Sequence, residues 1–250
     1  MNYANYIITH KEFTPPKKSC FIPLQVGFAN KIYDCRDNTG DNISEKNQNY
    51  CELTGVYWIW KNDIHSDYIG ISHYRRYFTK SKLSYSKFFF LNDKDVNIIF
   101  KDYDVILANE AVCNNNLIMQ YCENSGYLSD LNILRDAIKL HYPEYVDIYD
   151  SVMSGTKFSP YNMLIMKKED YNQYCEWLFN ILFEVEKHTD ISQYDNYKKR
   201  IYGFMSERLL NVWVQKQQYK IKHCRVVNPD LTYKQKIEEL LFRIKYKLGL

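Results

Sequence analysis

Two adjacent arginines, Arg75 and Arg76, follow a run of residues, 67–72, whose composition predicts a buried β-strand. Side chains at the carboxyl end of a strand in an open α/β sheet point into the region where loops gather and ligands bind. Paired guanidinium groups there suit an anionic group, because each offers several fixed N–H donors. His73 either donates to a ligand or completes the hydrogen bonding of the strand end. The segment predicts an anion-binding site, and the alternative is a solvated arginine pair.

A second group of polar side chains follows the first predicted strand, residues 6–9. Thr9, His10 and Lys11 stand at the end of that strand. Because the carboxyl ends of parallel strands meet at one edge of a sheet, these side chains are expected in the same crevice as the arginine pair. Lys11 would add a further positive charge to it.

Asp102 and Asp104 form an Asp-x-Asp triplet, whose carboxylate oxygens suit a divalent ion such as Mg²⁺ or Mn²⁺. We expect the triplet to join the same crevice. The apolar run 105–108 comes after the triplet, whereas a metal-binding triplet of this kind usually follows its strand. The alternative is a turn that leads into the strand.

A polar loop precedes an amphipathic helix predicted over residues 49–62. Asn, Asp, Ser and Gly fill this loop because their side chains bond to nearby backbone groups or tolerate unusual dihedral angles. Asn49 and Glu52 have the spacing of a capping box, which would start the helix. The side chains of this region that are suited to binding hydroxyl groups are Asp37, Asp41, Asn42 and Glu52.

The remaining elements are predicted from short apolar runs and helical periodicity. Strands are predicted at 6–9, 67–72, 103–108, 161–166 and 221–227. Helices are predicted at 49–62, 127–141, 169–187, 196–216 and 231–247. Strands that alternate with helices favour an α/β fold with a mostly parallel sheet flanked by helices.

The composition is that of one large domain. Of the 250 residues, 46% are hydrophobic, which is enough for a full core, and we assign residues 1–230 to one domain and 231–250 to a C-terminal helix. No run approaches the roughly 20 apolar residues that span a bilayer, and the first residues do not resemble a signal peptide. Seven cysteines without CxxC or zinc spacing are expected to be reduced. These features predict a cytoplasmic protein.

Charge is unevenly distributed along the chain. Residues 216–250 carry a net charge of +6, and the other 215 residues carry −3. No nucleic-acid motif accompanies the basic tail, which argues against nucleic acid as a partner. One face of the predicted C-terminal helix is apolar and is surrounded by basic residues; it comprises Tyr233, Ile237, Leu240, Leu241, Ile244 and Leu248. The pattern predicts either an interfacial helix at the anionic inner face of the cell membrane or a terminal helix packed on the domain.

Several segments together resemble the signature of a known family. DNTGDNISEKNxxYCELTxxYWxWKN begins at Asp37, YIGxxHYRRYF begins at Tyr68, and two further segments are Tyr161–Met166 and Gly203–Leu209. They resemble bacterial glycosyltransferases encoded in capsule, exopolysaccharide and lipopolysaccharide gene clusters. The resemblance implies a GT-A-like, Rossmann-like fold and transfer of a hexose from a UDP-sugar to a growing surface polysaccharide, with galactose in pyranose or furanose form as the candidate hexose. The alternative is a non-catalytic carbohydrate-binding or assembly protein of the same pathway.

The resemblance also implies roles for particular residues. Transfer with inversion needs a carboxylate to take the proton of the acceptor hydroxyl, and Glu207 is the leading candidate, with Asp130 as the second. The alternative for Glu207 is an ordinary helix salt bridge. Tyr161 and Asn162 are expected to contact the acceptor, a glycan or a lipid-linked glycan.

Residues from several segments are expected to bind the nucleotide sugar. They are Thr9, His10, Lys11, Asp41, Asn42, Glu52, His73, Arg75 and Arg76. A Mn²⁺ or Mg²⁺ ion on the Asp-x-Asp triplet would neutralise the leaving diphosphate. Without such an ion, the arginine pair and Lys11 would offset its charge directly, in a metal-independent mechanism.

Overall fold

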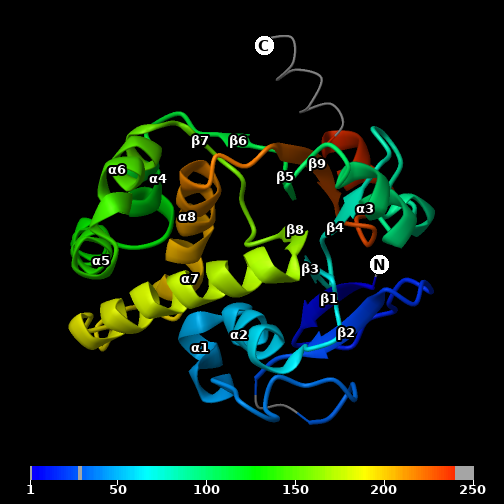
Figure 1. Ribbon diagram of the computed structural model, residues 1–250, viewed down its shortest axis with the longest axis horizontal. Helices are drawn as coiled ribbons and strands as arrows, with labels where there is room; N and C mark the ends of the chain where they lie inside the picture. Colours follow the sequence, from blue (N-terminus) through cyan, green and yellow to red (C-terminus); the bar gives the residue numbers. More distant parts are fainter. Residues whose placement is uncertain (1, 28–29, 240–250) are drawn as a thin grey trace.

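A seven-stranded sheet organises the protein, seen in a computed structural model that describes residues 2–27 and 30–239 (Figure 1). The strand order is β2-β1-β3-β8-β5-β9-β4. The strands are β1 (Tyr3–Thr9), β2 (Phe21–Gln25), β3 (Tyr68–His73), β4 (Tyr77–Thr79), β5 (Val105–Ala108), β8 (Leu164–Lys167) and β9 (Ile221–Val227). Five of them point the same way, while β8 and β4 run antiparallel to their neighbours. The carboxyl ends of β1, β3 and β5 therefore share one edge, called here the carboxyl edge.

Helices flank this sheet. They are α1 (Asn47–Tyr50), α2 (Leu53–Asn62), α3 (Asp93–Ile99), α4 (Leu117–Asn124), α5 (Leu128–His141), α6 (Val146–Ser154), α7 (Lys168–His188) and α8 (Ile201–Lys216). In Figure 1, α7 crosses the middle of the molecule, with α1 and α2 on one side of it and α4, α5 and α6 gathered at the left. A two-stranded ladder, β6 (Ala111–Val112) with β7 (Lys157–Phe158), connects the sheet to that helical group.

Alternating side chains of the strands fill two cores, one on each face of the sheet. Val105 and Leu107 of β5 belong to the larger core with α7 and α8, whereas Ile106 faces the smaller core. Because both faces of the sheet are covered, every residue of β1 is buried. In the smaller core, the rings of Tyr77 and Phe90 stack at 4.5 Å.

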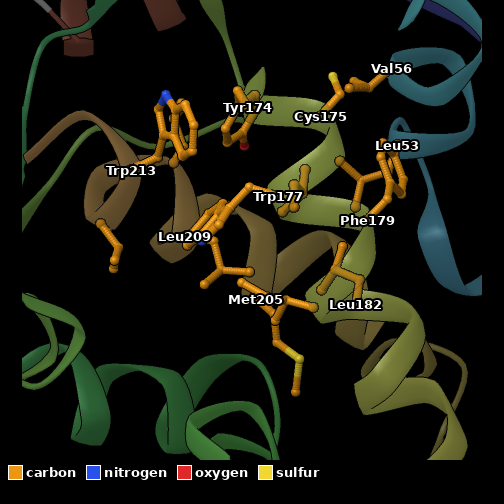
Figure 2. Close-up of a cluster of buried hydrophobic side chains, with 14 of the residues drawn as sticks. Leu53, Val56, Tyr174, Cys175, Trp177, Phe179, Leu182, Met205, Leu209 and Trp213 are labelled. Atoms are coloured by element: carbon orange, nitrogen blue, oxygen red, sulfur yellow. The ribbon is translucent and has the colours of Figure 1, made fainter. Parts of the chain in front are cut away.

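Aromatic side chains join α7 and α8 in the larger core (Figure 2). Trp213 of α8 lies 5.4 Å from the ring of Trp177 and 5.9 Å from that of Tyr174, both on α7. It also stacks on Tyr145 at 6.2 Å. Burying each large ring contributes about 1.5–3 kcal/mol or more, so this cluster fixes α8 against α7.

A strand lies in each of the five predicted segments, although the one predicted over 161–166 begins only at Leu164, because Tyr161 and Asn162 are left-handed. The helices predicted at 127–141, 169–187 and 196–216 correspond to α5, α7 and α8. The helix predicted over 49–62 is interrupted, and its predicted capping box is wrong. Cys51 has a φ of 52°, which ends α1, and α2 restarts at Leu53. The Asn49 amide donates instead to Lys199 O at 2.9 Å. The interruption frees the carboxylate of Glu52 for contacts outside the helix.

Residues 233–239 of the predicted C-terminal helix are helical, with Tyr233 82% exposed. Its other predicted apolar residues beyond Ile237, namely Leu240, Leu241, Ile244 and Leu248, lie outside the described residues. Within residues 2–27 and 30–239, no helix combines the length and the apolar character needed to cross a membrane.

The aromatic cluster leads to a prediction about stability. We expect Trp213→Ala to lower the free energy of unfolding by about 3–5 kcal/mol, because it opens a cavity among three other rings. Trp213→Phe should cost clearly less, since it keeps much of the ring and removes a buried indole N–H that has no hydrogen-bond partner among the described residues. Urea unfolding of both variants tests this, and equal losses would contradict the packing role of the ring.

Candidate active site

A strained turn just before β8 is the centre of the candidate site. Tyr161 has a φ of 82° and Asn162 a φ of 52°, so two successive non-glycine residues are left-handed. Such conformations cost free energy and persist only where the surroundings impose them. The amide of Asn162 donates to Glu52 Oε1 at 2.7 Å and to Gly203 O at 3.0 Å. The turn is therefore tied both to the α1–α2 interruption and to α8.

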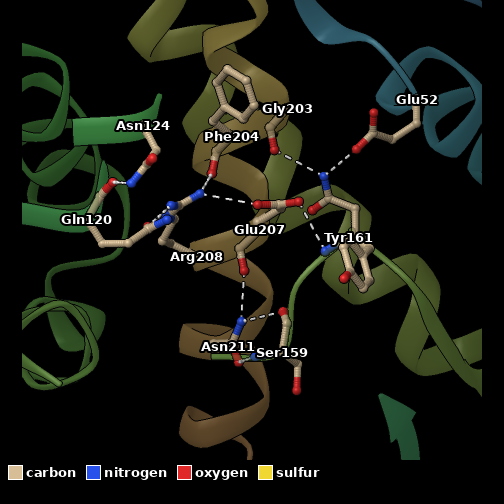
Figure 3. Close-up of polar contacts among 11 residues, drawn as sticks. Glu52, Gln120, Asn124, Ser159, Tyr161, Gly203, Phe204, Glu207, Arg208 and Asn211 are labelled. Carbon is tan, nitrogen blue, oxygen red and sulfur yellow. Dashed lines mark hydrogen bonds and ion pairs between the residues drawn. The ribbon is translucent and has the colours of Figure 1, made fainter. Parts of the chain in front are cut away.

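Glu207 closes the turn from α8 (Figure 3). Its Oε1 accepts the backbone N–H of Tyr161 at 3.0 Å, and its Oε2 accepts from Arg208 Nη1 at 3.2 Å. Burial raises the pKa of Glu207, and nearby Glu52 raises it further, while Arg208 is the strongest of the groups that lower it. The side chain keeps 21% of its surface exposed. A half-enclosed carboxylate with a raised pKa is suited to accepting a proton.

Arg208, which donates to Glu207, is itself buried, with 1% of its surface exposed. Its Nη1 donates to Phe204 O at 2.8 Å, and its Nη2 donates to Gln120 Oε1 of α4. The guanidinium lies 5.3 Å from the ring of Tyr121 and 5.1 Å from that of Phe158. Because these contacts fix the guanidinium, the carboxylate beside it has little freedom to rotate.

Basic side chains gather at the carboxyl edge beside this turn. This cationic cluster consists of His10, Lys11, Arg75, Arg76 and Arg200. The guanidinium of Arg76 lies 4.5 Å from the ring of Tyr161, and that of Arg75 lies 4.9 Å from the ring of Tyr74. Within the described part of the chain, no carboxylate lies within ion-pair distance of these five side chains. A cluster of cations without acidic partners is suited to a polyanion.

The nearby cations also lower the pKa values of the two histidines of the site. Burial lowers the pKa of His10, and the charges of Lys11, Arg75 and Arg200 lower it further. Burial also lowers the pKa of His73; Glu52 raises it in part, and Arg76 and Arg200 lower it. His73 Nε2 lies 2.8 Å from Tyr161 O and must carry the proton, because a carbonyl only accepts. His73 thus supports the strained turn from β3.

Among the other predicted ligands, Glu52 joins the site and three residues serve local structure. Thr9 closes the turn after β1, since its hydroxyl donates to Lys11 O at 2.6 Å. Asp41 lies beside the second half of α2, where its Oδ1 accepts from Tyr57 at 3.2 Å and its carbonyl oxygen accepts from Asn62 Nδ2, at the end of the helix, at 2.8 Å. Asn42 bonds to Ser44 in the same loop. The structure does not bring Asp41 and Asn42 to the cationic cluster, because α2 separates them from Glu52 by about 15 Å of helix.

Asp37 also has a structural role. Its carboxylate is fully buried and accepts from Thr54 Oγ1 at 2.6 Å and from the amide of Gly27 at 3.1 Å. Burial raises the pKa of Asp37, and these hydrogen bonds lower it. The polar loop is thus held together by its own side chains.

The prediction that the Asp-x-Asp triplet shares the crevice is wrong. Asp102 and Asp104 precede β5 and so lie at the edge of the sheet opposite the carboxyl edge. Asp104 Oδ2 accepts the amide of Lys220 at 2.8 Å, at the start of β9. The triplet is a turn into a strand and does not fit a metal at the candidate site. Across residues 2–27 and 30–239, no group of three or more His, Cys, Asp or Glu is placed to hold a metal ion.

Asp130, the second candidate base, caps α5. Its Oδ2 accepts the Tyr127 amide at 2.7 Å and the Tyr121 hydroxyl at 3.3 Å, and its Oδ1 accepts the Tyr194 hydroxyl at 2.5 Å. Only 1% of its surface is exposed. All of its bonding capacity serves the fold, and we correct its predicted role to that of a helix cap.

Two arginines of the site were missed as functional residues by the sequence interpretation. Arg200 looked like part of a solvated basic run, Lys198-Lys199-Arg200, although that run directly precedes the helix that carries Glu207. In the structure Arg200 Nε lies 3.2 Å from Cys51 Sγ, beside the α1–α2 interruption. Arg208 looked like an exposed salt-bridge partner, because nothing in the sequence shows that its helix face is enclosed.

The architecture can be compared with that of solved structures. The fold is that of a glycosyltransferase. The chain aligns with an apo structure of the WbbM bifunctional glycosyltransferase with a TM-score of 0.86 and 29% sequence identity. The alignment covers 92% of this chain and 46% of the WbbM chain, so this chain spans just under half of that protein. The mannosyltransferase Ktr4p from S. cerevisiae aligns with a TM-score of only 0.29 and 12% identity, over 83% of this chain and 54% of its own, and supports no argument.

The chain belongs to the family described as Domain of unknown function (DUF4422), which matches residues 5–218. A search of the curated proteins found no match. The α/β fold with a mostly parallel sheet and the resemblance to a glycosyltransferase family are thereby confirmed.

The raised pKa of Glu207 predicts how stability depends on pH. The folded state disfavours the ionised carboxylate, so the wild type loses stability as the pH rises through the pKa of the folded state. Glutamine does not ionise. The free energy of unfolding of Glu207→Gln relative to the wild type is therefore expected to increase between about pH 4 and about pH 8, as followed by urea unfolding.

Glu184→Gln is the matched control, with the opposite sign. Lys187, His188 and His141 hold the pKa of Glu184 down at about 2, so its charge stabilises the fold above the pKa of the unfolded chain. The relative stability of this variant should fall as the pH rises from about 2 to about 5. Curves of the same sign for both variants would contradict the assigned environments.

Proposed function

We propose that this protein is a glycosyltransferase that moves a hexose from a UDP-sugar to a growing bacterial surface polysaccharide of a capsule, exopolysaccharide or lipopolysaccharide. The observation that carries the proposal is the pairing of the cationic cluster with Glu207 across the Tyr161 turn: Arg76 lies on the Tyr161 ring, and Glu207 holds the Tyr161 amide. The fold shared with WbbM supports it. The family resemblance favours galactose, in pyranose or furanose form, as the hexose.

The cationic cluster is the proposed site of the donor diphosphate. Guanidinium N–H groups form charge-assisted hydrogen bonds to phosphate oxygens, and cations held at the leaving group stabilise the charge that develops on it. Since the Asp-x-Asp triplet lies at the opposite edge, we propose that Arg75, Arg76 and Lys11 supply this charge without a Mn²⁺ or Mg²⁺ ion. Titration with UDP in the presence and absence of Mn²⁺ tests whether binding of the diphosphate needs a metal ion.

Glu207 is the proposed base. As the acceptor oxygen attacks the anomeric carbon, its proton passes to the Glu207 carboxylate. The bond from the anomeric carbon to the diphosphate oxygen breaks, and its electron pair leaves with the diphosphate, next to the cationic cluster. Attack from the side opposite the leaving group inverts the anomeric centre. The protonated Glu207 then releases its proton to solvent.

The acceptor is proposed to approach over the Tyr161 turn. The ring of Tyr161 already packs on Arg76 and offers a face for a sugar. The amide of Asn162 is occupied by Glu52 and Gly203, so Asn162 is proposed to position the turn rather than to grip the acceptor. A lipid-linked glycan acceptor would place the protein in the cytoplasm at the inner face of the membrane, with the basic C-terminal segment 231–250 contacting anionic lipid.

Calorimetric titration tests the proposal. UDP, UDP-galactose and ATP are titrated into the wild type, Arg75→Ala and Glu207→Gln, with and without Mn²⁺. We expect UDP to bind the wild type and Glu207→Gln, and to bind Arg75→Ala roughly tenfold or more weakly, because a charge-assisted hydrogen bond contributes about 1.5–3 kcal/mol.

The matched control is Arg135→Ala, which removes a surface arginine paired with Asp150 on the helical group. UDP should bind it as it binds the wild type. No uridine nucleotide binding to the wild type, with or without Mn²⁺, would overturn the transferase proposal in favour of a non-catalytic carbohydrate-binding protein.

Arg208 provides a prediction about the rate of transfer. Arg208→Met removes the cation that most lowers the pKa of Glu207, so this pKa should rise and the acidic limb of the pH profile of kcat should move to higher pH. We expect kcat to fall about 10²-fold as well, because the carboxylate loses its fixed orientation. Arg208→Lys, which keeps the charge, should move the limb less. Equal loss of rate in both variants with an unmoved limb would show that Arg208 serves only the fold.

A further inference from the structure

A cavity that is separate from the cationic cluster lies between α6, α8 and the face of the sheet at β5 and β9. Its volume is about 550 Å³, within the range of about 300–1,000 Å³ typical of small-molecule sites. Side-chain amides and hydroxyls dominate its polar lining: Asn211, Gln215, Gln218, Ser151, Thr156 and Ser159. Leu107 and Ile221 of the sheet supply an apolar floor.

Asn211 connects this cavity to the proposed base. It stands one helical turn after Glu207, and its Nδ2 donates to Glu207 O at 2.7 Å. The same amide group exchanges two hydrogen bonds with the backbone of Ser159, at 2.8 and 3.1 Å. Side chains four residues apart on a helix lie about 5–6 Å from each other. The cavity therefore begins about one sugar residue away from the carboxylate.

The lining indicates the chemistry of the ligand. The charges of one lysine, Lys157, and one acid, Glu110, balance, and His223 is held by Ala108 O at 3.1 Å, so the cavity offers no arginine cluster for a phosphate. Amides and hydroxyls donate and accept hydrogen bonds, as the hydroxyls of a sugar do, and the ring of Tyr219 with the apolar floor suits the C–H face of a pyranose. The cationic cluster, by contrast, consists of basic side chains that suit an anion.

The backbone adds an independent observation. Gln218, just after α8, has a φ of 55°, a position where helices commonly use glycine. A glutamine there costs stability, and Gln218 is one of the residues that line the cavity. Strained non-glycine residues cluster at ligand sites, which accounts for a glutamine at this position.

We propose that this cavity is a glycan subsite, which binds a neutral sugar residue of the acceptor next to the one that reacts. The inference rests on the proposed function for its place in the reaction. Binding of a neutral sugar in the cavity, however, does not require the donor site to work.

Saturation-transfer NMR tests it with three probes: methyl β-D-galactopyranoside, methyl β-D-galactofuranoside and methyl α-D-mannopyranoside. The proteins are the wild type, Gln215→Ala, Gln218→Gly and their double variant. Gln193→Ala, which changes an exposed loop glutamine, is the matched control. Melting temperature and UDP binding are measured for each.

At least one methyl glycoside is expected to receive saturation from the wild type and from Gln193→Ala, with binding to Gln215→Ala and Gln218→Gly weakened roughly fivefold or more, the effect of one lost hydrogen bond. Gln218→Gly should at the same time melt at a higher temperature, because glycine relieves the left-handed backbone. Weaker binding by a more stable variant excludes misfolding as the cause.

Two outcomes overturn the inference: no saturation of any probe by the wild type, or undiminished saturation by the double variant. If UDP does not bind but the cavity variants lose the glycoside, the transferase proposal fails and the glycan subsite stands. If UDP binds and no glycoside does, the reverse holds.

Discussion

The left-handed turn at Tyr161 and Asn162 is the constraint on which the candidate site depends. Its backbone is bonded to Glu207 and His73, and the Asn162 side chain is bonded to Glu52 and Gly203. These four bonds come from three parts of the fold: the end of β3, the α1–α2 interruption, and α8, which supplies two of them. A relaxed turn would point the Tyr161 amide away from Glu207 and leave the carboxylate partly buried without its donor. The strain of the turn therefore sets the geometry of the proposed base.

Two electrostatic arrangements surround this turn and complement each other. Glu207 is buried enough for its pKa to rise, yet Arg208 beneath it keeps the charged form available. On the other side, the cationic cluster has no acidic partner within ion-pair distance in the described chain, and only the more distant charges of Glu52 near Arg200 and Glu207 near Arg76 relieve its repulsion. Unpaired like charges cost stability in the free protein. In the proposed reaction, these cations would stabilise the charged leaving group, and the nearby carboxylate would accept a proton from the neutral nucleophile.

Much of the fold could be predicted from the sequence, because doubly buried strands give continuous apolar runs and long amphipathic helices give a clear period. The order and direction of the strands could not be predicted, since β8 looks like any other apolar run and its antiparallel insertion depends on long-range packing.

The interruption at Cys51 could not be predicted from the sequence, because cysteine has no preference for a positive φ. Glu207 was found through family resemblance, whereas Arg200 and Arg208 were not. The burial of Arg208 depends on α4 and β7, and the position of Arg200 depends on Cys51, all far away in sequence. The roles of Asp130 and Asn42 were predicted wrongly, because a polar side chain that bonds to nearby groups of the fold cannot be distinguished in a sequence from one that binds a ligand.

The position of Asp102 and Asp104 has a wider consequence for the site. At the carboxyl edge, β5 is followed by Asn109 and Glu110, which offer one carboxylate, and Glu110 lines the glycan cavity. The described residues at this edge thus supply arginines and histidines where a metal site would supply paired aspartates. A diphosphate brings negative charge that must be offset wherever it binds, and at this edge only the side chains of the cationic cluster are placed to do so. We propose that the basic signature around Arg75 and Arg76 and the position of the Asp-x-Asp triplet belong to one arrangement, in which side-chain cations offset the charge that a metal ion would otherwise offset.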